Sequence, residues 1–375
     1  MSQHFPDSTL SSEVHSRLAA FELQIQQAAQ HYAGYPDNLN YDYSALTKFF
    51  KYSIINAGDP FVQTDWSLHS KDFEREAVEW FAKLYELDPC WGYVTSGGTE
   101  GNFHGMFIGR EHCPDGVLYF SEASHYSIPK AAYMMKIPFI IIPTLANGEM
   151  DCEVLAQKLA QNVDKPAIVN LNIGTTMDGA IDDIERVCHL LEHHPNQFYI
   201  HCDAALSGML LPFLDNAPQL SFKKYPIHSL AVSGNKFIGA PIPHGVVLSH
   251  PEISNKVSRQ VDYIGCQDST ILGVRNGLGA LCLWYAIKTR PLAAEAKACI
   301  QRAQYLQQAL NSLGFETQLN SFSNTVVFPQ PAKSLCQKWQ LALKDGRAHI
   351  VVMQHFDEEK IKEFLDDVRQ ATTYL

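Results

Sequence analysis

The sequence has neither a segment long and apolar enough to cross a membrane nor a cluster of basic residues. Its strongest apolar run, residues 137–143, is strand-length and contains prolines, whereas a membrane span needs about 18 apolar residues. Acidic residues outnumber basic ones by 40 to 29, which gives a net charge of −11, so a nucleic-acid backbone is a poor partner. The chain is 46% hydrophobic and 18% charged, and we expect it to bury a large core.

Cysteine is present, but not in a pattern that binds zinc or builds a disulfide framework. The 375 residues include nine cysteines, an odd number, and no CxxC pair, so neither kind of site is expected. Residues 1–10 are polar and lack the basic start and apolar stretch of a secretion signal. These features together predict a protein of the reducing cytoplasm.

Short apolar runs separated by helical patterns occupy the middle of the chain. Six such runs are found at residues 116–120, 139–143, 167–172, 198–202, 230–233 and 245–248. Strands alternating with helices are typical of an α/β domain with a mostly parallel sheet.

The two ends of the chain differ from this middle part. Residues 10–32 carry apolar side chains at helical spacing, and a second helix is expected over 72–87. The last 85 residues predict a helix over 293–313, strands at 325–328 and 349–354, and a helix over 357–373. We therefore predict an N-terminal helix and arm (1–55), a large domain (56–290) and a small C-terminal α+β domain (291–375).

Two polar motifs follow predicted strands of the large domain. The segment TSGGTEGN at 95–102 combines glycines and hydroxyls before a helix, which suits an anion, although a plain turn that caps a helix has the same composition. In the strand leading to Asp203, period-two alternation places Asp203 and Ala205 on one face. A helix cap is the simpler interpretation of this aspartate.

A lysine and a histidine add to these motifs. Lys236 follows the run that ends at Ser233 and stands among apolar residues. Burial lowers the pKa of an amine and makes it nucleophilic, whereas a surface lysine in a loop is the alternative. His125 is either an ordinary loop histidine or a flat partner for an aromatic ligand. Together, the four motifs provide what is needed to bind pyridoxal phosphate: a phosphate cradle, a carboxylate, two ring faces and an amine.

The sequence resembles the pyridoxal-phosphate-dependent amino-acid decarboxylases of group II, especially bacterial histidine decarboxylases and plant serine decarboxylases. The resemblance covers almost the whole chain and rests on the following segments: TSGGTEGN (95–102), HYSIPKA (125–131), IGTTMDGAIDDI (173–184), HCDAALSGMLLPF (201–213), SGNKFIGAPIPHG (233–245) and RNG (275–277). It implies the type I pyridoxal-phosphate fold of the aspartate aminotransferase kind. It also implies a homodimer, or a higher homo-oligomer, with the active site at the subunit interface.

The same resemblance implies a role for each candidate site residue. Lys236 bonds to the cofactor as a Schiff base, and Asp203 pairs with the ring nitrogen. His125 and Ala205 cover the two ring faces. The other implied cofactor contacts are Gly98, Thr99 and Ser233 at the phosphate, Thr176 near the ring, and Asn235 directly before the lysine. Tyr263, on the loop after the lysine strand, is the implied proton donor.

Several positions depart from the family pattern. Asn235 stands where relatives usually have histidine, and Leu278 follows Arg275-Asn276-Gly277 where histidine is usual. Residues 55–59 read INAGD, and residues 264–268 read IGCQD. Because these segments are where a side-chain pocket is expected, they bear on the substrate rather than on the cofactor chemistry.

The sequence thus predicts an amino-acid decarboxylase, with L-histidine as the first substrate to test. Serine decarboxylation and an oxygen-using, aldehyde-forming reaction are alternatives within the same chemistry. A catalytically silent partner that keeps the fold is a third hypothesis, which the intact Lys236, Asp203 and His125 disfavour. No metal site is expected: the candidates are His193-His194 and the His201/Asp203 pair, and His193-His194 lies in a polar stretch typical of a solvated turn.

Overall fold

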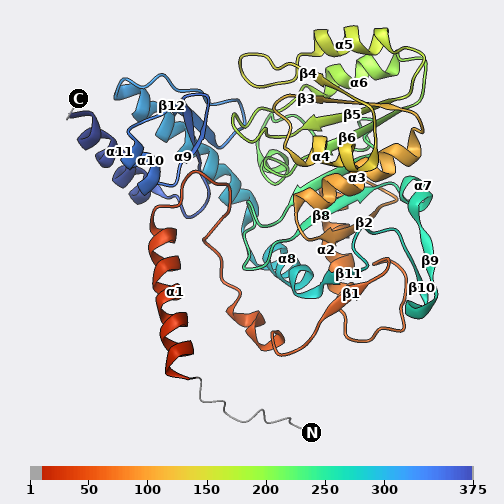
Figure 1. The fold of residues 1–375 in the computed structure, drawn as a ribbon, viewed down its shortest axis with the longest axis horizontal. Helices are drawn as coiled ribbons and strands as arrows, with labels where there is room; N and C mark the ends of the chain where they lie inside the picture. Colours follow the sequence, from red (N-terminus) through yellow and green to blue (C-terminus); the bar gives the residue numbers. More distant parts are fainter. Residues whose placement is uncertain (1–10, 374–375) are drawn as a thin grey trace.

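A seven-stranded sheet forms the centre of the molecule. The computed structural model describes residues 11–373, and Figure 1 shows the sheet surrounded by helices. In spatial order the strands are β2 (Trp91–Thr95), β8 (Gly245–Ser249), β7 (Ser229–Ser233), β6 (Phe198–Asp203), β5 (Ala167–Asn172), β3 (Val117–Ser121) and β4 (Phe139–Ile142). Only β8 runs against the others. The predicted α/β fold with a mostly parallel sheet is confirmed.

Helices cover both faces of this sheet. On one face α3 (Gly98–His112) and α4 (Ser127–Met135) bury side chains against Leu118, Ile168 and Tyr199. On the other face the helices are α2 (Lys71–Leu84), α5 (Cys152–Gln161), α6 (Ile184–Glu192) and α8 (Gly277–Thr289). Because neighbouring residues of a strand point to opposite faces, Val169 and Ile200 belong to this second layer.

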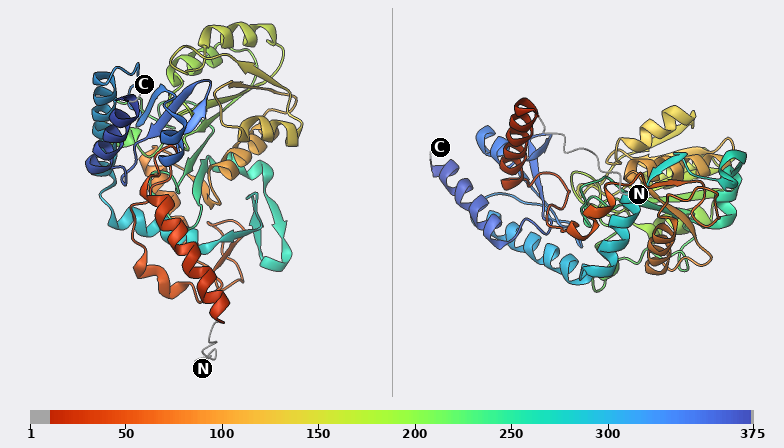
Figure 2. Two further views of the ribbon diagram at one scale, coloured as in Figure 1. Left: turned by 60° about the vertical axis from the view of Figure 1, so that its left-hand side comes forward. Right: turned by 90° about the horizontal axis from the view of Figure 1, so that it is seen from below.

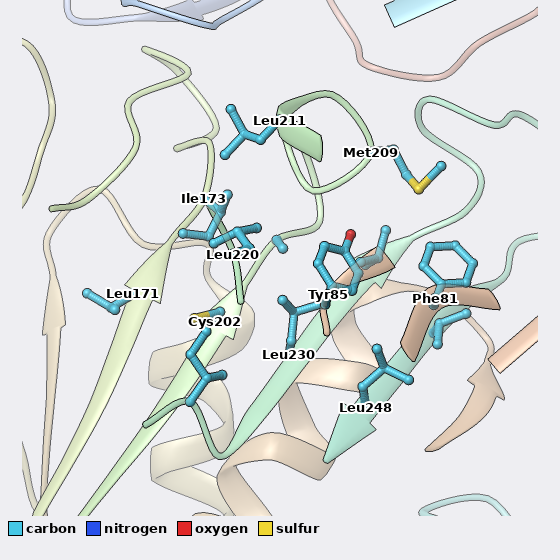
Figure 3. Close-up of a cluster of buried hydrophobic side chains, with 14 of the residues drawn as sticks. Phe81, Tyr85, Leu171, Ile173, Cys202, Met209, Leu211, Leu220, Leu230 and Leu248 are labelled. Carbon is cyan, nitrogen blue, oxygen red and sulfur yellow. The ribbon is translucent and has the colours of Figure 1, made fainter. Parts of the chain in front are cut away.

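The main hydrophobic core lies between the sheet and this second helical layer. In Figure 3, Phe81 and Tyr85 of the α2 region approach Leu230 of β7 and Leu248 of β8, and Cys202 of β6 lies nearby. All of these side chains are buried. Strands β3, β5 and β7 are buried at every position, as expected for parallel strands covered on both sides, and the core holds their carboxyl ends in fixed positions.

Local signals define where several helices begin. Asp151 caps α5 by accepting hydrogen bonds from the N–H groups of Glu153 and Val154. Asp183 caps α6 in the same way, and Asn276 caps α8. Asp, Asn and Ser are preferred at this position because their side chains satisfy free N–H groups of the first turn.

The C-terminal elements form a second core beside the large sheet. A three-stranded sheet contains β12 (Thr325–Pro329), β14 (Arg347–Val351) and β13 (Ala342–Lys344), and it packs with α9 (Leu292–Ser312), α10 (Lys333–Lys338) and α11 (Glu358–Thr373). Helix α9 contributes Cys299 to the main core and Leu306 to the second one. Ala33, from the N-terminal arm, is also part of the second core.

Helix α1 (Ser12–Gln30) stands away from the rest of the chain (Figures 1 and 2). None of its residues is buried, and its apolar side chains Val14, Leu18, Phe21 and Ile25 are exposed. Near its end, the backbone oxygen of Ala28 accepts a hydrogen bond from Gln340 at 2.6 Å. The helical spacing at 10–32 thus predicted the helix correctly, with Leu10 outside the described residues.

Small differences from the sequence prediction concern short or terminal segments. Two ribbons of three-residue strands were not predicted: β1 (Ile55–Ala57) with β11 (Val274–Asn276), and β9 (Arg259–Val261) with β10 (Cys266–Asp268). Three residues are too few to show a period of two. Helix α2 ends at Leu84 rather than at residue 87, because Glu86 has a left-handed backbone (φ 55°). Among the described residues, no helix is long and apolar enough to cross a membrane.

Candidate active site

Polar side chains gather where the parallel strands end. The parallel strands β2, β7, β6 and β5 end at Thr95, Ser233, Asp203 and Asn172, so these four residues lie along the carboxyl ends of the strands. These ends are the usual place for a ligand in an open α/β sheet. A cavity of about 220 Å³ opens there. Nine of the ten residues expected at the site line it: Gly98, Thr99, His125, Thr176, Asp203, Ala205, Ser233, Asn235 and Lys236.

Lys236 lies three residues beyond the end of β7. The N–H group of Asn38, from the N-terminal arm, donates a hydrogen bond to the Lys236 carbonyl at 3.0 Å. Burial lowers the pKa of the Lys236 amine, and the negative charges of Asp203 and Asp37 oppose this effect. A larger share of this amine is therefore neutral at pH 7 than for an exposed lysine, and the neutral amine is the nucleophilic form.

Asp203 ends β6 with its carboxylate held on both oxygens. The Nδ2 of Asn102, in α3, donates a hydrogen bond to Oδ2 at 2.7 Å. The backbone N–H of Ala205 donates to Oδ1 at 3.2 Å. Only 6% of the residue is exposed. Asp203 is therefore a buried carboxylate with a fixed orientation, and it lines the cavity. Such a carboxylate is suited to pair with a positive group in the cavity.

His125 precedes α4 and faces the same cavity. Its Nδ1 lies 2.8 Å from the Oγ of Ser127. Burial lowers the pKa of the imidazole, Asp203 raises it, and the positive charge of Lys236 lowers it further. Together these effects lower the pKa of His125 below its usual value of 6.5. The ring is therefore neutral at pH 7 and presents a flat aromatic surface.

The loop before α3 is shaped to receive an anion. Gly97 has φ of +133°, and a Cβ added at Gly98 would lie 2.4 Å from the Ser233 Oγ, so both positions need glycine. Glu100 anchors the loop, because its Oε2 accepts hydrogen bonds from the N–H and the hydroxyl of Ser96, both at 2.7 Å. The first N–H groups of α3 lack helical partners and carry the positive end of the helix dipole.

The remaining expected residues differ in their surroundings. Thr176 is exposed at the rim of the cavity. The Nδ2 of Asn235 donates a hydrogen bond to the Oδ1 of Asp37 at 2.9 Å. Tyr263 does not line the cavity: it lies in η4 (Asp262–Ile264), at the tip of the β9–β10 ribbon, and is 87% exposed.

Three residues near the site were not singled out from the sequence. Asn102 and Ser127 lie inside the motifs 95–102 and 125–131, but a neutral amide or hydroxyl in a helix gives no chemical signal of its own. Asp37 lies 198 residues before Asn235, so only the folded chain brings the two together. Within the described residues, no group of three or more His, Cys, Asp or Glu side chains could hold a metal ion.

Comparison with known proteins gives one consistent family. Residues 112–329 match the pyridoxal-dependent decarboxylase conserved domain. Serine decarboxylase 1 of Oryza sativa subsp. japonica is 44% identical over 96% of this chain and 76% of that protein. The histidine decarboxylase of Vibrio campbellii is 42% identical over 96% of this chain and 95% of that protein.

Solved structures agree with the fold. The L-methionine decarboxylase of Streptomyces sp. 590 superposes with a TM-score of 0.88, over 97% of this chain and 96% of that one, at 24% identity. The glutamate decarboxylase of Lactobacillus brevis gives a TM-score of 0.81, with 98% and 93% of the two chains covered at 17% identity. At these identities the superpositions support the type I fold alone.

Proposed function

The chain belongs to the pyridoxal-dependent decarboxylase family and uses pyridoxal 5'-phosphate as its cofactor, and we propose that it converts L-histidine to histamine and CO2. The proposal is carried by the match to the Vibrio histidine decarboxylase, which spans 95% of that protein, against 76% of the rice serine decarboxylase. Similar identity to both kinds of enzyme makes serine the second candidate.

The cavity residues fit this cofactor. Gly98 leaves space beside Ser233 that a Cβ would fill, which suits a phosphate against the start of α3. A lysine amine and a buried carboxylate line the same cavity. When bound, pyridoxal phosphate supplies a ring that accepts the electron pair left on Cα as CO2 departs.

We propose that Lys236 holds the cofactor covalently and that Asp203 keeps its ring nitrogen protonated. Two opposite unit charges 4 Å apart interact by about 4 kcal/mol at an effective dielectric of 20. This is enough to hold a proton on the pyridine nitrogen near pH 7. The two hydrogen bonds that Asp203 accepts support this role, because they keep the carboxylate oriented while it carries its charge.

We propose that His125 and Ala205 lie on opposite faces of the cofactor ring and hold it in place. Gly98, Thr99 and Ser233 bind the phosphate, with Thr176 and Asn235 beside the ring and the lysine. With the ring held in place by these residues, the bond from Cα to the carboxylate would be the one presented for cleavage, which favours loss of CO2 over other reactions at Cα. The neutral state of His125 supports a stacking role rather than a charged one.

We propose that the protein acts as a homodimer in which Tyr263 reaches the partner's active site. Tyr263 is 87% exposed and lies outside the cavity of its own chain. Helix α1 exposes an apolar side that a second copy can bury. In this arrangement the Tyr263 hydroxyl donates the proton that replaces the carboxylate on Cα.

The cytoplasm is the proposed location. All nine cysteines are unpaired, and eight of them are buried. Free thiols in this number are typical of proteins in a reducing compartment.

The substrate is tested by product analysis. The purified protein with pyridoxal phosphate is incubated with each common L-amino acid, with and without oxygen, and amines, aldehydes and CO2 are measured. We expect histamine and CO2 in equal amounts from histidine, independent of oxygen. Ethanolamine from serine as the main product would assign the second candidate. An aldehyde formed with oxygen consumption would instead assign the oxygen-using reaction.

A further inference from the structure

A continuous chain of hydrogen bonds, all buried except the part-buried one at His125, runs beneath the cavity and branches at one residue. It connects β6 and β7 to the starts of α3 and α4. Its members are Tyr199, Ser229, His201, Asn102, Asp203, Ser127 and His125. Asn102, which is 1% exposed, lies at the branch point.

The direction of each bond around Asn102 follows from chemistry. The Asp203 carboxylate can only accept, so the amide NH2 group of Asn102 must face it, at 2.7 Å. The second amide hydrogen then points to the Ser127 Oγ at 2.9 Å. The amide oxygen, left on the other side, accepts from the Nε2 of His201 at 3.0 Å.

The same reasoning assigns the proton of His125. The Ser127 Oγ already accepts a hydrogen from Asn102, so its own hydrogen is free to point to the Nδ1 of His125, 2.8 Å away. The backbone N–H of Ser127 points to the same nitrogen at 3.3 Å. With two donors facing it, Nδ1 is an acceptor, and the proton of the neutral ring lies on Nε2.

We propose that Asn102 is a positioning residue that orients two cofactor-facing groups at once: the Asp203 carboxylate directly, and the His125 ring, with its proton on Nε2, through Ser127. This inference rests on the proposed roles of Asp203 and His125. The far side of the network supports it. The Tyr199 hydroxyl donates a hydrogen bond to the Ser229 Oγ at 2.6 Å, and the Ser229 Oγ lies 2.6 Å from the Nδ1 of His201. Because the Ser229 hydroxyl faces Nδ1 of His201, the proton of this ring lies on Nε2, which donates to the amide oxygen of Asn102. This bond prevents the Asn102 amide from rotating by 180°.

The first test reads the protonation of His125 directly. Protein labelled with [15N]histidine and loaded with pyridoxal phosphate is studied by NMR, and the His125 signals are assigned by their absence in His125→Gln. We expect wild type to show an unprotonated, hydrogen-bonded Nδ1 and a protonated Nε2. In Ser127→Ala the Nδ1 signal should move toward that of a mixture of the two neutral forms.

A matched control exists in the same loop. Among the described residues, the buried hydroxyl of Ser124 has no hydrogen-bond partner, so Ser124→Ala removes a hydroxyl without touching the network. Its His125 signals should equal those of wild type. A proton on Nδ1 in wild type, or identical spectra for Ser127→Ala and Ser124→Ala, would overturn the inference.

The second test measures the dissociation constant of pyridoxal phosphate. Asn102→Asp keeps the size of the side chain but sets a second carboxylate against Asp203, so the constant should rise about tenfold to a hundredfold. Ser127→Ala, which leaves the bond to Asp203 in place, should change it less than about threefold. Equal constants for wild type and a folded Asn102→Asp would contradict the Asp203 branch. If Asn102→Asp does not fold, the spectra of Ser127→Ala still test the His125 branch, and failure of that branch alone overturns the inference.

Failure of the proposed function would look different. If wild type does not take up pyridoxal phosphate, or if Asp203→Asn binds it and turns over as wild type does, the proposed roles themselves are wrong. If wild type and Asp203→Asn behave as proposed while the Asn102 and Ser127 variants match Ser124→Ala, only the positioning role fails.

Discussion

Asp37 of the N-terminal arm accepts a hydrogen bond at 2.9 Å from Asn235, the residue directly before Lys236. The other carboxylate oxygen of Asp37 accepts from the hydroxyl of Tyr32 at 2.7 Å. The arm and the lysine loop are thereby joined at the edge of the cavity. Asparagine makes this bond without changing its charge between pH 5 and 8, where a histidine would titrate.

The charge of Asp37 should tune the lysine amine. Asp37 raises the pKa of Lys236, so Asp37→Asn should lower it and leave more neutral amine at pH 7. We expect the cofactor-free variant to incorporate pyridoxal phosphate faster near pH 7, with the pH midpoint of the incorporation rate shifted down. Stopped-flow absorbance measures this rate. An unchanged or upward-shifted midpoint would show that Asp37 does not act on the amine.

The ion pair between Glu74 and Arg275 should be a major contributor to stability. Both side chains are almost fully buried, with a nitrogen-to-oxygen distance of 3.1 Å, and Glu74 also accepts from Asn56 and from the N–H of Val94. Arg275→Leu leaves a buried carboxylate without its partner, at a cost of about 3–5 kcal/mol in the free energy of unfolding.

Urea denaturation checks this value against a matched pair on the surface. Arg75 and Asp72 lie 2.8 Å apart at the surface, with 41% and 76% of their side chains exposed, so Arg75→Leu should cost less than about 1 kcal/mol. Similar losses for the two leucine variants would contradict the importance assigned to the buried pair.

Buried histidines should make the fold sensitive to acid. Burial lowers the pKa of His104 to about 4, from 6.5. Between these values the unfolded chain binds a proton that the folded chain does not, so stability is retained above pH 6.5 and is lost as the pH falls toward 4. His104→Phe should reduce this slope by about 1.4 kcal/mol per pH unit. Unfolding free energies from pH 4 to 7 measure it, and equal slopes for variant and wild type would reject the assignment.

Mixing two inactive variants tests whether Tyr263 serves the partner's site. Lys236→Ala and Tyr263→Phe should each lose activity. In a mixed dimer, one site then carries both defects and the other carries none. An equal mixture that exchanges subunits freely should recover about a quarter of wild-type activity, because half of the dimers are mixed and half of their sites are intact. No recovery after proven exchange would place Tyr263 in its own chain's site, or outside catalysis.

The sequence predicted the parts of the fold that depend on local patterns. Strand β5 at 167–172 was predicted to the residue, because four of its six residues are apolar and the run ends at Asn172. The direction of β8 could not be predicted, since a buried strand has the same composition whether it runs parallel or antiparallel. The exposed apolar side of α1 shows a related limit. The helical spacing of its apolar residues predicts a helix, but it does not predict which surface packs against that helix.

For the site, the motifs predicted which residues line the cavity but not what orients them. Lys236, Asp203 and His125 carry chemistry that is recognisable in a sequence. Asn102 and Asp37 act through hydrogen bonds to residues about 100 and 200 positions away. Such contacts arise only when the sheet has been assembled.

The central claim is that Lys236 holds the cofactor covalently in the cavity that Asp203 also lines. The most direct measurement is reduction of the pyridoxal-phosphate-loaded protein with borohydride, followed by proteolysis and peptide mass spectrometry. We expect the added cofactor mass on the peptide that contains Lys236, and none on the corresponding peptide of Lys236→Ala. Modification of a different lysine in wild type, or no modification at all, would contradict the account.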